Sequence, residues 1–131
     1  MTGTVTAVDS GAFLRPTIID GLDHTSRTST EEIFGPVVTV HRFDTDEQAI
    51  EMANSTEYGL AGSIWSTNID RAHALAQQIE TGIIWVNTWL HRDLRTPFGG
   101  VKNSGVGREG GSWSLGFFSE PLNVCIKHGQ E

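Results

Sequence analysis

The sequence predicts an α/β fold in which helices cover the faces of a parallel sheet. Two observations carry this prediction. Three short segments are rich in β-branched and other apolar residues, and the two segments between them place apolar residues at helical spacing. Strands that are apolar on both faces and joined by helical crossovers favour a parallel sheet. We therefore expect the order βαβαβ, with right-handed crossovers.

The first strand and helix are expected directly after Pro36. Residues 37–43 are mostly β-branched and follow Gly-Pro, which favours a strand that begins at the proline. A Thr-Asp-Glu-Gln run comes next and is typical of a capping box. In that motif the Thr45 hydroxyl accepts from a backbone N–H at the helix start, and Gln48 reaches back. The helix should end before Tyr58.

The second βα unit is expected to follow at once. Residues 60–65 predict a strand, after which Thr67 or Asn68 can cap a helix. The apolar residues of this helix recur at i, i+3, i+4 and i+7, namely Ala72, Leu75, Ala76 and Ile79. Gly82 stands where a glycine is common just after a helix, and residues 83–87 predict a third, almost wholly apolar strand.

The C-terminal third has a different composition. A polar and aromatic loop leads into a segment with six glycines between Gly99 and Gly111. Residues 113–118 predict a short helix and residues 122–127 a last strand. No internal repeat and no low-complexity linker interrupts the chain.

Composition and charge exclude several classes of partner. The chain has 131 residues, enough for one compact core, and no apolar run approaches the ~18 residues of a membrane span. A formal charge of −7 opposes binding to nucleic acid or an acidic membrane. The first six residues resemble no secretion signal, and the lone Cys125 can form no internal disulfide. We therefore expect a reduced, cytoplasmic compartment.

Several motifs occur in the order known from one family. They are residues 11–17, residues 31–37 (Glu-Glu-Ile-Phe-Gly-Pro-Val), Asn54 with residues 58–61, residues 82–87, and residues 97–109 (Pro-Phe-Gly-Gly-Val-Lys-Asn-Ser-Gly-Val-Gly-Arg-Glu). Together they resemble the C-terminal part of the catalytic domain of NAD(P)-dependent aldehyde dehydrogenases. The resemblance implies that residues 1–119 belong to that domain and that residues 120–131 form an oligomerisation strand and tail.

The resemblance assigns cofactor-binding roles to two residues. The position of Glu32 binds the ribose hydroxyls on the nicotinamide side, and that of Phe34 packs beside the nicotinamide. A carboxylate can accept two charge-assisted hydrogen bonds from a vicinal diol, and a ring offers an apolar surface for accurate placement. The alternative is that Glu31 and Glu32 form a solvated acidic pair before a strand; Glu31 is expected to be solvated in either case.

The family's catalytic groups are not among these motifs. Its nucleophilic cysteine, its general base and its oxyanion donors lie ahead of the Glu-Ile-Phe-Gly-Pro motif, as does its dinucleotide-binding domain. We therefore assign no catalytic residue here and expect only an incomplete site for NAD or NADP. Cys125 is expected to lie in an apolar strand as an inert small hydrophobe.

A second glycine motif is misleading. Residues 105–110 spell G-x-G-x-x-G, the dinucleotide-binding fingerprint, but that fingerprint needs a strand directly before it and a helix directly after it. The preceding residues 102–104 are expected to be a loop. We interpret the segment as a structural turn.

The segment His-Arg-Asp-Leu-Arg at 91–95 concentrates positive charge in an acidic chain. The resemblance places this loop at the substrate entrance, and its form is similar to that of dehydrogenases for 2-hydroxymuconate or 2-aminomuconate semialdehyde. Arg92, and secondarily Arg95, would bind a substrate carboxylate bidentately, with Phe98 nearby. The alternative is that both arginines pair with Asp93 or other surface acids. The histidines lack metal-ligand spacing, so no metal site is expected.

Three functions are open at this point. The first is a fragment of a dehydrogenase for a small aldehyde, which is expected to be inactive alone. Its partners would be the missing N-terminal half or further copies. Trp65, Trp85 and Phe98 would then be exposed and cause self-association. The second is a stand-alone dimeric binding module. The third is an enzyme of another class that reuses Glu32 and Arg92, although nothing in the sequence supplies it with a nucleophile.

Overall fold

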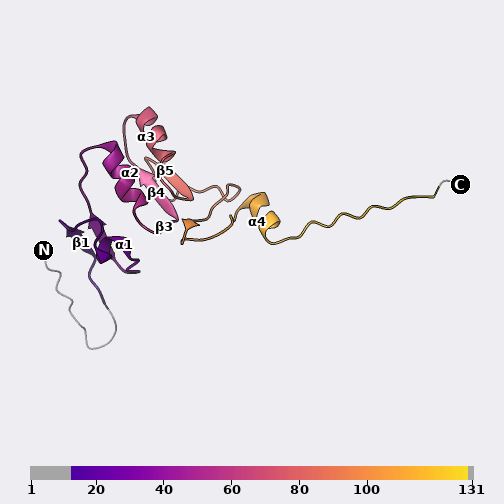
Figure 1. The fold of residues 1–131 in the computed structure, drawn as a ribbon, viewed down its shortest axis with the longest axis horizontal. Helices are drawn as coiled ribbons and strands as arrows, with labels where there is room; N and C mark the ends of the chain where they lie inside the picture. The colour runs from indigo at the N-terminus through magenta and orange to yellow at the C-terminus, as the bar shows by residue number, and fades with distance from the viewer. Residues whose placement is uncertain (1–12, 130–131) are drawn as a thin grey trace.

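The computed structural model describes residues 13–129. Gly11 and Ala12 of the first motif, and the six residues considered for a secretion signal, lie outside the described residues. The elements in chain order are β1 (Thr17–Asp20), α1 (Arg27–Thr30), β2 (Val37–Val40), α2 (Asp46–Asn54), β3 (Tyr58–Gly59), β4 (Ala61–Ile64), α3 (Ile69–Ala76), β5 (Ile83–Val86), β6 (Val101–Lys102) and α4 (Gly111–Phe117) (Figure 1). The mixture of helices and parallel strands confirms the α/β class.

The strands pair differently from the expected single sheet. β4 and β5 are parallel and joined through α3, as predicted, with Ala61 opposite Ile83. β2, however, pairs with β1 in parallel rather than with β4, and β3 pairs with β6 in antiparallel. The reason is that residues 17–20, which sequence analysis left without an element, supply the hydrogen-bonding partner along β2.

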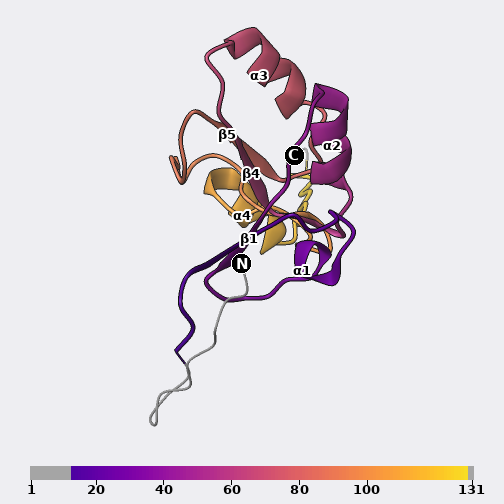
Figure 2. The same ribbon diagram turned by 90° about the vertical axis from the view of Figure 1, so that its left-hand side faces the viewer.

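The two longer helices begin where their capping residues predict. The Thr45 side chain accepts from the N–H of Gln48, and Gln48 Oε1 accepts from the N–H of Asp44 at 2.8 Å, one residue before the cap. Asn68 caps α3 by accepting from Arg71 N at 3.0 Å. α2 and α3 lie side by side in both ribbon views (Figure 1 and Figure 2).

Gly82 has a different role from the one predicted. α3 ends at Ala76 with Gln77 as its cap, so Ile79 lies beyond the helix and Gly82 does not terminate it. A Cβ on Gly82 would lie 1.5 Å from the carbonyl oxygen of Gly99. The residue must be glycine because the glycine-rich segment packs directly against the start of β5.

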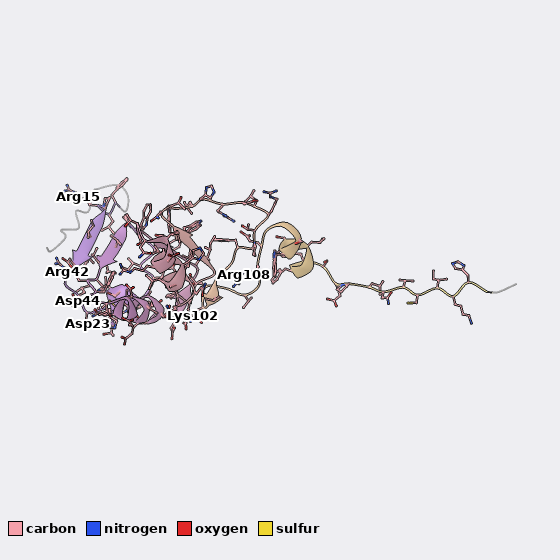
Figure 3. The ribbon with its side chains drawn as sticks, turned by 90° about the horizontal axis from the view of Figure 1, so that it is seen from above. Arg15, Asp23, Arg42, Asp44, Lys102 and Arg108 are labelled. Carbon is pink, nitrogen blue, oxygen red and sulfur yellow. The ribbon has the colours of Figure 1, made fainter. Side chains whose placement is uncertain are left out.

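The C-terminal tail is extended but forms no strand. The helix expected at 113–118 is confirmed as α4, whereas residues 122–127 have no strand pairing in the described part of the chain. The tail leads away from the folded part, and its side chains stand clear of it (Figure 1 and Figure 3). Strand structure needs a neighbouring edge, and residues 13–129 place none beside this segment. Cys125 is therefore exposed, contrary to the prediction of an apolar strand environment.

The core is small. Among residues 13–129, only Ala72 and Trp85 are buried apolar residues. Of the three side chains expected to be exposed, Trp65 is 66% exposed, Phe98 is half-buried and Trp85 is only 5% exposed, so the prediction was wrong for Trp85. None of the helices within residues 13–129 has the length and apolar character needed to cross a membrane.

Candidate functional site

Two adjacent glutamates have different surroundings. Glu31 follows α1 and pairs with Arg27 one turn earlier, with Arg27 Nε 2.7 Å from Glu31 Oε1. This hydrogen bond holds the pKa of the Glu31 carboxyl below its ordinary value. Glu32 makes no side-chain hydrogen bond or ion pair with residues 13–129, and it lines a cavity of about 560 Å³ together with Tyr58 and Ser104. Glu31 is thus paired with Arg27 at the surface, while the Glu32 carboxylate is open to a ligand.

Phe34 presents its ring to solvent from an unusual backbone conformation. Its φ is 54°, in the left-handed region that residues other than glycine seldom adopt, and its side chain is 93% exposed. Such a conformation costs about 1–3 kcal/mol and is found most often at functional sites. The structure therefore places an open carboxylate and a projecting ring two residues apart.

The loop between β5 and residue 98 is fixed at its start by tryptophans. Trp85 Nε1 donates to the carbonyl oxygen of His91 at 2.8 Å, and the rings of Trp85 and Trp89 meet edge to face at 5.0 Å between centroids. Asn87 and Leu90 both have positive φ, at 55°. Because Trp85 is buried, its indole anchors the residue next to Arg92.

Arg92 and Phe98 come together. The Arg92 guanidinium carbon lies 4.3 Å from the centroid of the Phe98 ring. Arg92 Nη2 also approaches Glu109 Oε1 at 3.3 Å. Phe98 and Glu109 in turn form a two-way backbone bridge, each N–H donating to the other's carbonyl oxygen at 2.8 Å. Glu109 is a member of this cluster that sequence reasoning missed, since nothing in the sequence relates it to a residue 17 positions earlier.

Arg95 does not join the cluster. Its Nε and Nη2 both bind the Asp93 carboxylate, and its side chain is 87% exposed. The same hydrogen bonds lower the pKa of Asp93. The alternative from the sequence, in which both arginines pair with acids, therefore describes both residues in this structure. Arg95 binds the Asp93 carboxylate through two nitrogens, whereas Arg92 makes a single contact with Glu109.

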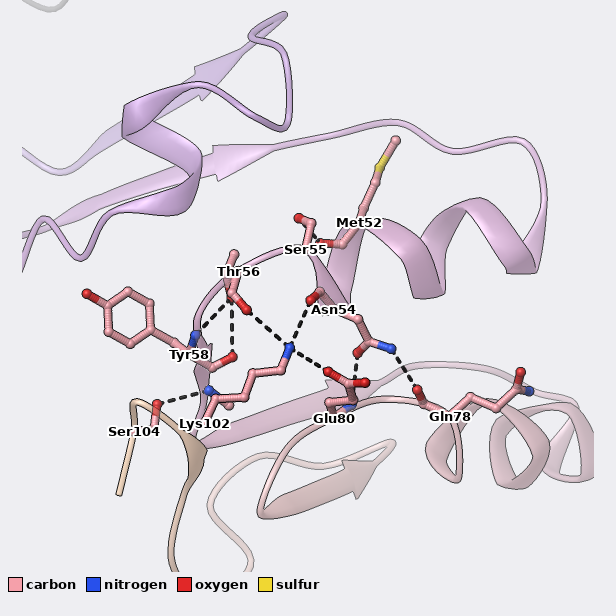
Figure 4. A network of polar contacts seen from close by, with 10 residues as sticks. Met52, Asn54, Ser55, Thr56, Tyr58, Gln78, Glu80, Lys102 and Ser104 are labelled. Carbon is pink, nitrogen blue, oxygen red and sulfur yellow. Dashed lines mark hydrogen bonds and ion pairs between the residues drawn. The ribbon is translucent and has the colours of Figure 1, made fainter. Parts of the chain in front are cut away.

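A polar network fixes β6, the strand that follows this loop (Figure 4). Lys102 Nζ donates to the carbonyl oxygens of Asn54 and Thr56, at 2.8 and 3.1 Å, and pairs with Glu80 at 2.6 Å. The Asn54 amide completes the network by donating to Gln78 O and accepting from Glu80 N, both at 2.8 Å. These contacts hold β6 to the ends of α2 and α3. Asn54 and Lys102 both lie within family motifs, but nothing in the sequence indicates that they are in contact.

Gly107 and Gly110 of the segment 105–110 allow close packing. A Cβ on Gly107 would lie 2.3 Å from the Phe117 ring, and one on Gly110 would lie 2.2 Å from Thr96 O. The strand before them, β6, has two residues and is antiparallel. Within residues 13–129 no group of acidic, histidine or cysteine side chains has the geometry of a metal site.

Comparisons with known proteins identify relatives. Residues 1–124 match the aldehyde dehydrogenase family. The chain is 57% identical over 117 residues to the 2-hydroxymuconic semialdehyde dehydrogenase of Pseudomonas putida, which covers 89% of this chain and 24% of that protein. It is 47% identical over 119 residues to the 2-aminomuconic semialdehyde dehydrogenase of Homo sapiens, covering 91% of this chain and 24% of that protein.

The fold is also that of solved enzymes. The crystal structure of betaine aldehyde dehydrogenase from Staphylococcus aureus in complex with NAD⁺ matches with a TM-score of 0.79 and 42% identity, over 82% of this chain and 21% of that chain. The chain spans about a quarter of the length of the curated relatives it matches. The match over residues 1–124 shows that this chain belongs to the aldehyde dehydrogenase family, and its relatives confirm the resemblance to muconate semialdehyde dehydrogenases.

Proposed function

We propose that the chain supplies the nicotinamide side and the substrate entrance of an NAD(P)-dependent dehydrogenase that oxidises a carboxylated semialdehyde, such as 2-hydroxymuconate semialdehyde, to the acid. The observation that carries the proposal is Arg92, which lies against Phe98 and keeps most of its donors for a ligand. The named activities of the relatives support the same substrate class.

The residues present fit the nicotinamide half of the cofactor. The Glu32 carboxylate has no protein partner within residues 13–129 and faces a cavity, so it can accept hydrogen bonds from two ribose hydroxyls. The exposed ring of Phe34 offers an apolar surface beside it. When bound, the cofactor accepts two electrons and a proton from the aldehyde carbon. Neither Glu32 nor Phe34 determines whether NAD or NADP is bound. The solved relative from Staphylococcus aureus binds NAD⁺.

The substrate carboxylate is bound at the loop. A guanidinium carries five N–H donors in a planar fork that matches a carboxylate in two places. Arg92 makes one protein hydrogen bond within the described residues, to Glu109, and its guanidinium carbon lies 4.3 Å from the centroid of the Phe98 ring. Arg95 is the weaker candidate because Asp93 already takes its fork.

We further propose that these 131 residues are inactive on their own. Their single cysteine, Cys125, lies in the exposed tail, and within residues 13–129 its thiol hydrogen-bonds the Asn123 side chain at 3.7 Å and no basic group that could activate it. The nucleophile and general base of the complete enzyme then come from the part of the relatives' length that this chain does not span.

A stand-alone dimeric module is the alternative, and the tail favours it. Leu122, Val124 and Ile126 alternate with Asn123, Cys125 and Lys127 along an extended segment and are exposed. An extended segment of this pattern can add to a sheet edge of a second copy. The division of the chain at residues 119 and 120 into a catalytic-domain part and an oligomerisation strand belongs to this proposal.

The experiment uses a hybrid enzyme in which residues 1–124 of this chain replace the matching segment of the Pseudomonas putida enzyme. Arg92→Ala in this hybrid should lower kcat/KM for a carboxylated semialdehyde by about 30-fold or more, since we expect substrate and the rest of the enzyme to bury this charge pair, and truncating a buried pair costs ~2–5 kcal/mol. An uncharged aldehyde of the same length should be oxidised as before. Arg42→Ala is the matched control, because Arg42 is exposed and pairs with Asp20 at 3.8 Å. A loss of only a few-fold would contradict the proposal.

A further inference from the structure

We propose that Glu109 is a positioning residue that holds Arg92 in the orientation that receives the substrate carboxylate. The inference rests on the substrate role proposed for Arg92 and adds a second residue, from a different segment, to the specificity of that site. Three contacts carry it: Arg92 on Phe98, Arg92 with Glu109, and the backbone bridge between Phe98 and Glu109.

The bridge places the two side chains that Arg92 contacts on the same face. Phe98 and Glu109 lie directly opposite each other in an antiparallel pair, and side chains of opposite residues project to the same side. The Arg92 guanidinium meets the Phe98 ring at 4.3 Å and the Glu109 carboxylate at 3.3 Å. Ring and carboxylate together restrict a side chain that would otherwise sample many rotamers.

Phe98 and Glu109 restrain Arg92 but leave most of its N–H donors available to a ligand. Glu109 takes one donor, on Nη2, which leaves the remaining N–H groups of the fork for a second carboxylate. Arg95 provides the contrast within the same loop, because Asp93 takes both its Nε and its Nη2. A single, slightly long contact at 3.3 Å orients a guanidinium and still permits bidentate binding of a ligand.

The backbone around Glu109 is suited to this role. Arg108 Nη1 donates to the carbonyl oxygens of Gly100 and Gly107, at 2.9 and 2.6 Å, and so ties the residue next to Glu109 to the glycine-rich turn. Glu109 therefore belongs to a fixed segment, whereas Arg92 lies in a loop. Removing the Glu109 carboxylate should release the arginine and leave the segment in place.

The test measures KM and kcat of the hybrid enzyme with a carboxylated semialdehyde and with an uncharged aldehyde of the same length. Glu109→Ala should raise KM about 3- to 10-fold for the carboxylated substrate alone, the cost of ordering one rotamer-rich side chain on binding. Glu109→Gln keeps an oxygen that accepts from Nη2, so it should restore KM to the unsubstituted value or lower. Glu57→Ala, which removes an exposed carboxylate bound to Asn103, is the matched control.

A double substitution separates this inference from the proposed function. In an Arg92→Ala background, Glu109→Ala should change nothing further. If Arg92→Ala itself leaves KM unchanged, the substrate role of Arg92 is wrong. If Arg92→Ala raises KM while Glu109→Ala does not, or if Glu109→Ala affects both aldehydes equally, Glu109 is not a positioning residue. Should Glu109→Ala fail to fold, Glu109→Asp is used instead. It keeps the charge, is one methylene shorter, and carries the same expected rise in KM.

Discussion

Gly82 shows how one residue type can satisfy two different requirements. A glycine after a helical pattern commonly ends the helix, and sequence analysis gave Gly82 that role. In the structure the helix has already ended at Ala76, and Gly82 is needed because Gly99 lies against it. The two roles look the same in the sequence, since the second depends on a contact between residues 17 positions apart.

Gly82→Ala should therefore destabilise the chain more than an ordinary surface substitution. The new Cβ would overlap the Gly99 carbonyl, and the backbone must move to admit it, at a cost of about 1–3 kcal/mol. Urea denaturation followed by tryptophan fluorescence measures the difference. Gly116→Ala is the control, because a Cβ there meets nothing within 4 Å and alanine favours a helix. Equal midpoints for the two variants would contradict the close-contact role.

The two arginines proposed to bind the substrate show which features can be predicted from single residues and which cannot. The charge pattern identified both Arg92 and Arg95 as candidates, but their ranking depends on partners. Asp93 is adjacent in sequence and was considered, whereas Glu109 was not. The roles of Glu32, Phe34, Arg92 and Arg95 remain predictions.

At the scale of elements, local signals predicted well and non-local ones did not. α2 and α3 have caps and apolar spacing within their own sequences, and both begin at the predicted caps, although α3 ends at Ala76, before Ile79. β3 and β6 were missed because each has two residues and exists only through pairing with the other. β1 was also missed, although its Thr-Ile-Ile-Asp sequence is as β-branched as the strands that were predicted. The tail was expected to be a strand, and it has no partner edge in the described chain. Local chemistry thus determines helices, while strand pairing depends on what the rest of the fold supplies.

The contact between α2 and α3 predicts a pH dependence. Arg71 hydrogen-bonds Asp46 across the two helix starts, with Nε 2.8 Å from Oδ2, and this lowers the pKa of Asp46 below its ordinary 3.8. A carboxyl whose pKa is lowered by folding stabilises the fold above its unfolded pKa. That contribution disappears as the pH falls through the folded pKa. The tether between α2 and α3 should therefore persist to pH values below 3.8.

An NMR titration of the Asp46 carboxyl carbon measures this effect. In the unsubstituted chain the midpoint should lie below 3.8, and Arg71→Gln should return it toward that value. Asp93 serves as an internal control, because its pKa is lowered by Arg95 and should stay low in the Arg71 variant. An Asp46 midpoint that does not respond to Arg71→Gln would contradict the assignment.

At the scale of the whole molecule, the chain buries few apolar side chains and exposes many. Its described core contains two buried apolar residues, while one face of the β1–β2 pair exposes Ile18, Val38 and Val40. Sequence analysis expected apolar strands covered on both faces, and the structure covers one face of this pair. The relatives have about four times the length of this chain, and in them such a surface has more protein to pack against.

The purified 131-residue chain should accordingly self-associate and reduce no NAD with any aldehyde. Sedimentation velocity measures the first property, and the absorbance of the reduced cofactor measures the second. Deleting residues 120–131 separates two causes. Association through the exposed β1–β2 face persists without the tail, as we expect, whereas a defined dimer that dissociates on deletion would support the stand-alone module. Measurable turnover would overturn the proposal of inactivity.

Trp85 in β5 and Trp89 in the loop that follows it give this region an optical property. Trp85 is buried, and Trp89 meets it edge to face at 5.0 Å with an interplanar angle of 63°. Indoles this close, and inclined to each other, couple their electronic transitions and produce a paired circular dichroism band that neither ring gives alone. Because Trp85 also binds the backbone of His91, the band reports the conformation of the residues that lead into Arg92. Ligand-driven movement of the loop can thus be followed in solution without a label.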